Sequence, residues 1–425
     1  MAGASSALAQ ERPIVDTDSS KRDSLGFVRR MLKNTSANAS FRGEFWSSSK
    51  SLDDKDGFGV GAVWLKGQST FPATPLSLKW EGWVQNQSLI RSGTIEAELR
   101  EGYVNLDFDK FSYRVGRQIT VWGRADAINP TDNVSSRDYS LMVPDENDQR
   151  RGNFSAKAAY AFGDFNLIGF WLPEFRENVF PLPALPAPIV LTKRKPKTEW
   201  SQWAFKIERT GGAADWSLSY FDGLDRNPDL TVEGISNSAV KLALTHHRIR
   251  VIGADAAAPA GRFGLRAEAA YAFTEDNEGT DPQIKNPFLF VVLGGDRSFF
   301  QYLNFNLQYV SRIVMKYQDP RQISDPATRA LAVQEAQLTQ QLDQFQHGLS
   351  NRVGYKWLHE TLEADLSSLL WLDEGDFLLR PKLIYALTDH WKATLGAELY
   401  RGPAEGVFGR LKQNSTGFAA LRYDL

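Results

Sequence analysis

Apolar and polar residues alternate with a period of two along most of the chain from residue 39 onwards. A period of two is typical of a β-strand with one apolar and one polar face. The polar face is too rich in Lys, Arg, Asp and Glu for the core of a soluble sandwich, and the other face is too apolar for water. The pattern therefore predicts an all-β fold, a transmembrane antiparallel β-barrel with lipid outside and a wet lumen inside.

Eighteen segments carry this pattern. They span 39–49, 57–67, 76–89, 93–107, 111–121, 152–162, 164–173, 199–210, 215–222, 246–257, 262–274, 286–294, 298–312, 347–357, 361–372, 376–387, 391–401 and 416–425. An even number places both ends of the chain on the same side of the membrane. A mean length of about eleven residues fits a tilted strand that crosses the bilayer. Sixteen strands stay possible, because the segments 246–257 and 286–294 are weakly patterned.

The connections between these segments form two alternating sets. One set is mostly short: 107–110, 163, 210–214, 258–261, 295–297, 358–360 and 388–390. The other set contains all the long connections: 122–151, 174–198, 223–245, 275–285, 313–346 and 402–415. Short periplasmic turns and long extracellular loops are the asymmetry expected of an outer-membrane barrel. A soluble solenoid or propeller would need a fixed repeat, and the segment spacing shows none.

The two ends of the chain fit an exported barrel. Residues 1–10 resemble the end of a secretory signal peptide, since Ala7-Leu8-Ala9 has the small-x-small form of a cleavage site; a disordered terminus of small residues is the alternative. We expect 11–38 to be a periplasmic segment with a short helix over 23–33, and 39–425 to be the barrel. The final segment ends at Leu425 and would close the barrel against the first strand. It also resembles the signal read by the barrel-assembly machinery, which usually ends in Phe or Trp.

Composition narrows the chemistry. With 49 basic and 51 acidic residues, the chain lacks the basic excess that nucleic-acid binding needs. It has no Cys, which excludes disulfides and thiolate metal sites and suits a Gram-negative envelope. No Gly-x-Ser-x-Gly, His-Glu-x-x-His or phosphate-loop motif is present. His246 and His247 are neighbours on a predicted strand, so they should face opposite sides. We therefore expect neither an enzyme nor a cofactor.

The alternation assigns charged side chains of both signs to the wall of the lumen. Facing rows of opposite charge would create a transverse field in a pore, whereas pairing across strands would stiffen the wall, and the sequence leaves both open. The inward candidates are Arg42, Lys79, Glu81, Glu96, Glu98, Arg100, Arg114, Lys206, Arg266, Glu268, Arg380, Lys382, Glu398 and Arg422.

The stretch 122–151 is the main candidate for a functional site. It has no strand or helix period and is rich in turn-forming and charged residues. Its apolar residues, such as Ile128 and Met142, favour an ordered loop. Eighteen strands leave an aqueous channel unless something fills it, and this loop is long enough to fold inward as a constriction or gate. The candidate constriction residues, including the strand before the loop, are Arg117, Trp122, Arg124, Asp126, Asn129, Asp132, Arg137 and Asp138.

Two further features of the loops have alternative interpretations. Asp126, Asn129, Asp132 and Asn133 could hold Ca²⁺, but they lack EF-hand spacing, and Asn-Pro-x-Asp is more often a turn. We therefore expect no metal. Residues 326–345 have helical spacing after a Ser-Asp-Pro start signal. This helix could be a lid, a docking element for a partner, or a surface helix packed on neighbouring loops.

The residues 116–132 carry a resemblance. They read GRQITVWG and then AINPTD, which is similar to the G-(K/R)-Q-x-x-x-W-G…NP-x-D segment of a broad group of proteobacterial outer-membrane barrels. This group includes the DUF1302-type proteins and, more distantly, the alginate-export porin family. The resemblance implies a large monomeric barrel that acts in transport, in some members beside resistance-nodulation-division exporters of hydrophobic molecules. The alginate-export pattern has an Arg-rich lumen, and the mixed lumen here departs from it.

Three functional hypotheses follow. The first is a porin-like or exporter-like channel of the bacterial outer membrane that passes a solute through a loop-constricted lumen. The second is a closed outer-membrane component of a multi-protein envelope complex, such as a lipid exporter with periplasmic or inner-membrane components. The third is a surface binding or adhesion barrel that uses loops 174–198 and 313–346. The expected partners are outer-membrane lipid, lipopolysaccharide and the barrel-assembly machinery, with no nucleic acid.

Overall fold

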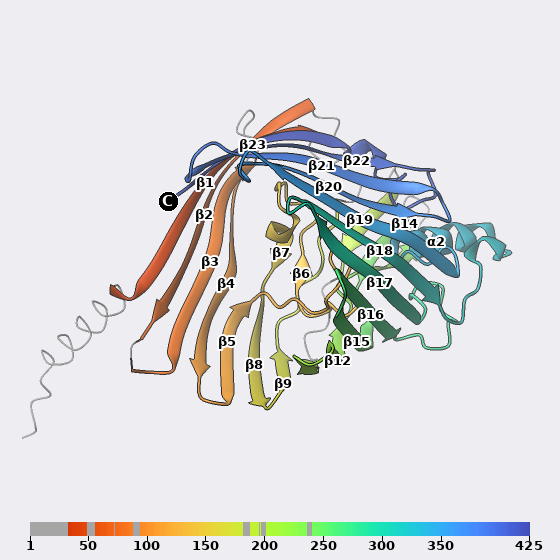
Figure 1. Cartoon of the computed structure of the whole chain (residues 1–425). Helices are drawn as coiled ribbons and strands as arrows, with labels where there is room; N and C mark the ends of the chain where they lie inside the picture. The colour runs from red at the N-terminus through yellow and green to blue at the C-terminus, as the bar shows by residue number, and fades with distance from the viewer. Residues whose placement is uncertain are drawn as a thin grey trace, which may run out of the picture.

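Eighteen antiparallel strands pair side by side and close into a barrel (Figure 1). The computed structural model describes residues 33–48, 56–71, 73–87, 94–181, 188–194, 196, 201–235 and 240–425. The barrel strands are β1 (Thr35–Ser48), β2 (Asp56–Thr70), β3 (Leu76–Gln87), β4 (Ile95–Asp107), β5 (Phe111–Gln118), β8 (Asn153–Phe162), β9 (Phe165–Leu172), β11 (Gln202–Arg209), β12 (Asp215–Leu224), β15 (Arg248–Ala260), β16 (Phe263–Phe273), β17 (Phe288–Phe299), β18 (Leu303–Val314), β19 (Phe345–Trp357), β20 (Leu362–Trp371), β21 (Asp376–Ala386), β22 (Trp391–Arg401) and β23 (Thr416–Asp424). The prediction of eighteen strands is confirmed, and the alternative of sixteen is wrong.

The barrel closes where β23 pairs with β1. The register joins Trp46 to Phe418, and the centroids of their rings lie 4.4 Å apart. The amide of Leu425 donates to the carbonyl of Ala39 at 2.9 Å, which continues the pairing to the end of the chain. Closure removes the free strand edges of the described sheet, so the backbone groups of the wall are paired, as a position in lipid requires.

The period of two decides which side chains face lipid and which face the lumen. On β22, Leu395 points outward and is 57% exposed, whereas Glu398 points inward and is buried. Large apolar side chains remain exposed on the outer face of most strands, among them Phe45, Val84, Leu99, Val115, Phe205, Leu218, Ile252, Leu293, Leu307 and Leu383. An apolar outer surface around a charged interior is the arrangement of an outer-membrane β-barrel.

The connections sort by length as the sequence predicts. The chain between β4 and β5, between β8 and β9, and between β15 and β16 makes tight turns. On the opposite side, the connections from β5 to β8, β9 to β11, β12 to β15 and β18 to β19 are long.

Two local predictions about these connections are wrong. The turn expected at 295–297 lies at 300–302, because Gly295 and its neighbours pair with β16 and β18 in spite of their turn-like composition. Phe300 and Gln301 make that turn with positive φ angles of 52° and 67°. His246 and His247 do not face opposite sides of a strand, because β15 begins only at Arg248.

The long extracellular connections carry structure that the sequence pattern did not reveal. A three-stranded sheet is formed by β10 (Ile189–Lys193), β14 (Val240–Thr245) and β13 (Asp229–Ile235). Two short strands, β6 (Ser136–Arg137) and β7 (Arg150–Arg151), pair with each other. The described residues of these connections also contain the 3-10 turns η1 (Glu146–Gln149), η2 (Pro320–Gln322) and η3 (Lys412–Asn414).

The helix expected from residue 326 is present as α2 (Pro326–Leu338). Asp325 caps it, since its carboxylate accepts from the amide of Thr328 at 2.8 Å. The helix stops at Leu338 and does not continue to residue 345, because the chain rejoins the barrel at β19.

The start of the barrel differs from the expected boundary. β1 begins at Thr35, not at residue 39, so the last residues assigned to the periplasmic segment belong to the wall. The helix expected over 23–33 and the signal remnant at 1–10 fall outside the described residues, except for Lys33. Within the described part of the chain, no helix is long and apolar enough to span a bilayer.

The two faces of β22 provide a test of the membrane orientation. Leu395→Arg places a charge on the lipid-facing side near the middle of the strand, and we expect it to destabilise the folded barrel by about 2–4 kcal/mol. Thr394→Arg, one residue away and facing the lumen, should change the stability much less. Urea unfolding of both variants in lipid vesicles measures the difference. Equal losses for the two variants would contradict the assigned faces.

Candidate functional site

The chain leaves the barrel wall after β5 and turns into the lumen. The last residue of β5, Gln118, is buried, and its side-chain amide donates to the carbonyl of Ser155 at 3.1 Å. The amide of Thr120 then donates to the hydroxyl of Ser135 at 2.7 Å, which draws the chain inward. Figure 1 shows β6 and β7, which belong to this segment, inside the ring of barrel strands. We call residues 119–152 the inner loop.

The inner loop contacts separate parts of the barrel wall. Its first part packs against the later strands, since Ala125 is buried in a cluster with Val310 of β18 and Trp371 of β20. Its second part packs against the beginning of the barrel, where Met142 is buried with Trp46 of β1. The loop therefore crosses the lumen and does not follow one wall.

Trp122 fixes the point where the loop departs. Its side chain is buried and packs edge-on against Phe170 of β9, with ring centroids 6.0 Å apart. The ammonium of Lys206 lies 6.0 Å from the centroid of the Trp122 ring. The sequence placed Trp122 among the constriction residues, and the structure places it in the apolar packing behind them.

One buried carboxylate holds the first half of the inner loop. Glu268 of β16 accepts from the amides of Arg124, Ala125 and Thr131 at 3.0, 3.1 and 2.8 Å, and from the Thr131 hydroxyl at 2.9 Å. Hydrogen bonds to a charged acceptor are about twice as strong as neutral ones. Gly123 has a φ of 89°, and a Cβ at this position would collide with the Glu268 carboxylate. This collision explains the glycine of the Trp-Gly pair.

Two ion pairs add to this attachment. Arg124 contacts Asp255 of β15, with 2.6 Å between Nε and Oδ1. Within the loop, Asp132 accepts from the Trp122 amide at 3.2 Å and pairs with Arg150 at 2.6 Å. Arg124 and Asp132, predicted as constriction residues, thus hold the loop in shape.

A β-bulge in β4 brings two consecutive charges to the inner face. The register with β3 shifts after Glu81, so that Arg100 and Glu101 both point inward and are both buried. Glu101 pairs with Lys79 at 2.5 Å and accepts from the amide of Ile119 at 3.3 Å. Strict alternation predicted Arg100 and missed Glu101.

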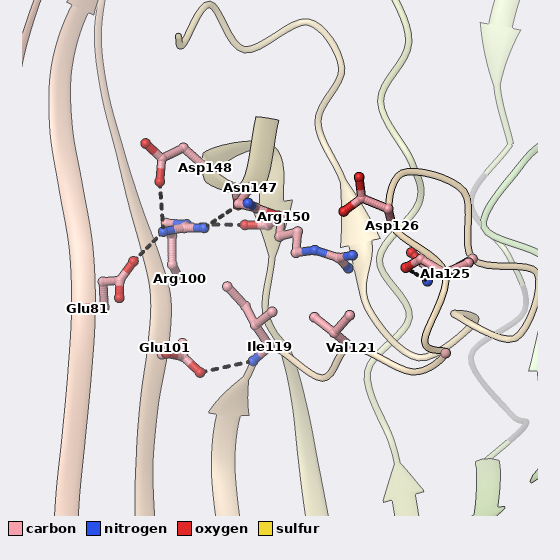
Figure 2. Close-up of a pocket in the computed structure, with 12 residues that line it drawn as sticks. Glu81, Arg100, Glu101, Ile119, Val121, Ala125, Asp126, Asn147, Asp148 and Arg150 are labelled. Carbon is pink, nitrogen blue, oxygen red and sulfur yellow. Dashed lines mark hydrogen bonds and ion pairs between the residues drawn. The ribbon is translucent and has the colours of Figure 1, made fainter. Parts of the chain in front are cut away.

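Arg100 connects the wall to the second half of the loop. Its guanidinium pairs with Glu81 of β3 and lies 3.7 Å from Asp148. It also donates to the carbonyls of Asn147 and Arg150, at 2.8 and 3.2 Å (Figure 2). The Arg100 guanidinium thus donates three hydrogen bonds, which hold its side chain in one position in the lumen.

The turn η1 carries two acidic residues that reach other parts of the wall. Asp148 pairs with Arg42 of β1 at 2.6 Å, and the Arg42 guanidinium lies 4.0 Å from the centroid of Trp64. Glu146 pairs with Arg380 of β21 at 2.8 Å. The loop is thereby linked to β1, β4 and β21 by charge.

A cavity remains between the loop and the wall formed by β3 and β4. It has a volume of about 490 Å³ and is lined from the wall by Glu81, Arg100 and Glu101, as Figure 2 shows. From the loop it is lined by residues that include Asp126 and Asn129, and the Asp126 side chain is exposed. A second cavity of about 280 Å³ shares Arg100 with it. Charges of both signs therefore face the free space beside the loop.

Neighbouring loops hold the inner loop from the extracellular side. Arg176, after β9, donates to the carbonyl of Gly152 in the inner loop at 2.8 Å and pairs with Glu98 of β4 at 2.6 Å. Arg226, after β12, donates to the carbonyls of Asn133 and Val134 of the inner loop, at 3.0 and 2.5 Å. Burial lowers the pKa of Arg226 to about 10, which leaves it protonated at neutral pH.

Arg137 and Asp138 take part in the same connection. The Arg137 amide donates to the side chain of Asn178 at 2.8 Å. The Asp138 carboxylate accepts from the amide of Ser140 at 3.0 Å and shapes a turn. Both residues therefore contribute to the position of the loop.

The other predicted residues can be placed from the strand register. The fourteen lumen candidates all occupy inward positions of their strands. Arg117 does not line the lumen. It follows Tyr113 and Val115 on the outer face of β5 and pairs with Glu174 at 2.8 Å. The period of two could have predicted this orientation. Arg114 and Arg117 are three positions apart, so on a regular strand they face opposite sides.

Two of the residues considered for Ca²⁺ make other contacts. Asp132 is engaged by Arg150, and the amide of Asn129 donates to the carbonyl of Ala125 at 2.7 Å. Among the described residues, no group of three or more His, Asp or Glu side chains has the geometry of a metal site. The arrangement agrees with the turn interpretation of this sequence.

Comparison with known proteins places the fold among solved outer-membrane proteins. The chain is similar to Pseudomonas aeruginosa OpdL, with 12% identity, a TM-score of 0.52, and coverage of 93% of this chain and 99% of that chain. It is similar to Acinetobacter baumannii OccAB4 at 11% identity and a TM-score of 0.55, covering 92% and 98%. It is also similar to P. aeruginosa OccK2 (OpdF) in complex with glucuronate, at 8% identity and a TM-score of 0.56, covering 92% and 98%. No protein-family model and no curated protein matches the sequence. At these identities, the likeness concerns the fold of the barrel.

The attachment at Glu268 can be tested directly. Glu268→Gln turns one acceptor oxygen into a donor that faces the loop amides, so we expect at least two hydrogen bonds to be lost. Amide hydrogen exchange of residues 124–131 should become about tenfold faster or more. Arg266→Gln is the matched control, because Arg266 is on the same face of β16 and pairs with Asp296, not with the loop. Unchanged exchange in Glu268→Gln would refute the role of this carboxylate.

Proposed function

We propose that this protein is an outer-membrane channel that passes a small polar solute through a lumen narrowed by the inner loop. The observation that carries this proposal is the loop itself, which crosses a closed eighteen-stranded barrel and leaves a cavity with charged walls. Barrels of this size enclose a water-filled channel unless a segment occupies it. A loop held at a fixed distance from the wall narrows such a channel and does not need to fill it.

The charges at the cavity favour a polar solute over an apolar one. Arg100 faces the same space as Glu81, Glu101 and Asp126. Fixed charges of both signs create a transverse field, which orients a solute with separated charges or a strong dipole. An apolar molecule would displace water from these charged groups and offer them no hydrogen bonds in return, which is unfavourable.

The motif shared with DUF1302-type and alginate-export barrels concerns residues that position the inner loop. It does not identify the solute. The glycine and tryptophan of that motif, Gly123 and Trp122, form the departure point of the inner loop. Thr131 within Asn-Pro-Thr-Asp binds Glu268, and Asp132 binds Arg150. The motif thus supports a constricted transport barrel. The lumen carries charges of both signs, which does not favour lipid or alginate as the exported molecule.

Conductance tests the channel directly. The purified protein in planar bilayers should conduct ions without added partners, because a cavity with charged walls remains beside the loop. Deletion of 124–150 should increase the conductance, since the obstacle is removed. Absence of conductance in both forms would reject the channel and would favour a closed component of an envelope complex.

The charge of Asp126 should influence ion selectivity. Asp126→Lys reverses an exposed charge in the cavity that takes no part in the described loop contacts, so we expect the reversal potential in a KCl gradient to shift toward anions. Asp109→Lys makes the same charge change at an exposed periplasmic turn and should leave the reversal potential nearly unchanged. Equal shifts for the two variants would show that the cavity does not control selectivity.

A further inference from the structure

A cluster of buried charges lies among the extracellular loops, away from the inner loop. At its centre is Asp229, at the start of β13, which is fully buried. Lys285 lies 3.1 Å from Asp229 and 2.7 Å from Asp225. Nδ1 of His247 lies 2.6 Å from the Asp229 carboxylate. Glu335 of α2, which is 4% exposed, completes the cluster and binds the amide of Leu230.

The cluster joins three separate connections of the barrel. Asp225, Asp229 and His247 belong to the chain between β12 and β15, Lys285 to the chain between β16 and β17, and Glu335 to the chain between β18 and β19. Helix α2 packs on β13 through this contact. On its other side, Arg410, between β22 and β23, donates to the carbonyl of Gln337 at 2.6 Å. The helix therefore extends from the loop after β12 to the loop after β22.

The charges of these five groups balance when Glu335 is neutral and His247 is protonated. With Asp225 and Asp229 ionised, Lys285 and His247 protonated and Glu335 neutral, the sum is zero. A neutral Glu335 can also donate a hydrogen bond to the adjacent Asp229. Loss of a proton from either Glu335 or His247 leaves excess negative charge in a buried site, which is strongly destabilising.

We propose that this cluster is a pH-sensitive latch that fastens helix α2 to the extracellular loops at neutral pH and releases it in alkaline solution. Other charged groups also face the cluster. Glu275 is a further acidic group near His247, and the guanidinium groups of Arg312, on β18, and of Arg226 lie near Asp225.

The direction of the pH effect follows from the groups at the helix contact. Burial, together with the charge of Asp229, raises the pKa of Glu335 well above its ordinary value. Burial lowers the pKa of His247, but the hydrogen bond to Asp229 and the negative charges of Asp229 and Glu275 together outweigh burial, so that the pKa of His247 is raised overall. Groups with raised pKa values stabilise the folded arrangement at low pH, and this contribution is lost as the pH rises through the folded-state pKa.

The latch can be followed with two spin labels, because the chain contains no Cys. Asn277→Cys in the loop after β16 and Ala330→Cys in α2 provide exposed attachment sites on the two sides of the contact. Pulsed electron paramagnetic resonance should give a narrow distance distribution at about pH 6 and a longer, broader one by about pH 10. A distribution that stays the same across this range would overturn the proposal.

Variants separate the latch from general alkaline unfolding. Glu335→Gln keeps the hydrogen-bonding shape and cannot ionise, so the midpoint of release should rise by about one pH unit or more. Glu278→Gln, an exposed carboxylate of the same loop as the label, should leave the midpoint unchanged. Lys285→Met removes a positive charge that lowers the pKa of both Glu335 and His247, so it should raise the midpoint, which provides a second test if Glu335→Gln does not fold. Identical midpoints in wild type and Glu335→Gln would also overturn the proposal.

Discussion

The structure depends on the closed hydrogen-bond ladder between β1 and β23. In a hydrocarbon layer, an unpaired amide or carbonyl has no water to bind, so a sheet of this size is stable there only if its first and last strands meet. The pairing of Trp46 with Phe418 and the bond from Leu425 to Ala39 complete that ring. Closure then fixes two surfaces with opposite chemistry, and the charged one is available only to water, to solutes and to segments of the chain itself.

The inner loop is the segment that uses this charged surface. Its backbone amides bind a wall carboxylate, Glu268, and its own charges pair with Arg42, Arg100 and Arg380. Side chains that a sequence would assign to solute binding are therefore largely occupied by the loop. The space that remains lies between the loop, at Asp126 and Asn129, and strands β3 and β4. Under the proposed function, most charged residues of the loop attach it to the wall, whereas Asp126 faces the path of the solute.

Sequence patterns predicted the barrel well because the period of two is a local property of each strand. They also located the inner loop and most of its charged residues. They could not assign roles, because the partners of those residues are distant in sequence: Thr131 meets Glu268 across 137 positions. Strict alternation gave the wrong orientation for Glu101, because a bulge adds a residue to β4. For Arg117, alternation predicts the outward orientation that the structure has, but Arg117 was still placed among the constriction residues. The three-stranded sheet and the buried cluster around Asp229 were not predicted, because the connections that form them have no regular pattern of apolar and polar residues.

The attachment of the inner loop to Glu268 has a consequence for the assembly of the barrel. The loop follows β5, but the carboxylate that holds it is on β16, which is made much later in the chain. The loop cannot take its final position before the greater part of the wall exists. The attachment that narrows the lumen therefore requires that β16 has already joined the wall.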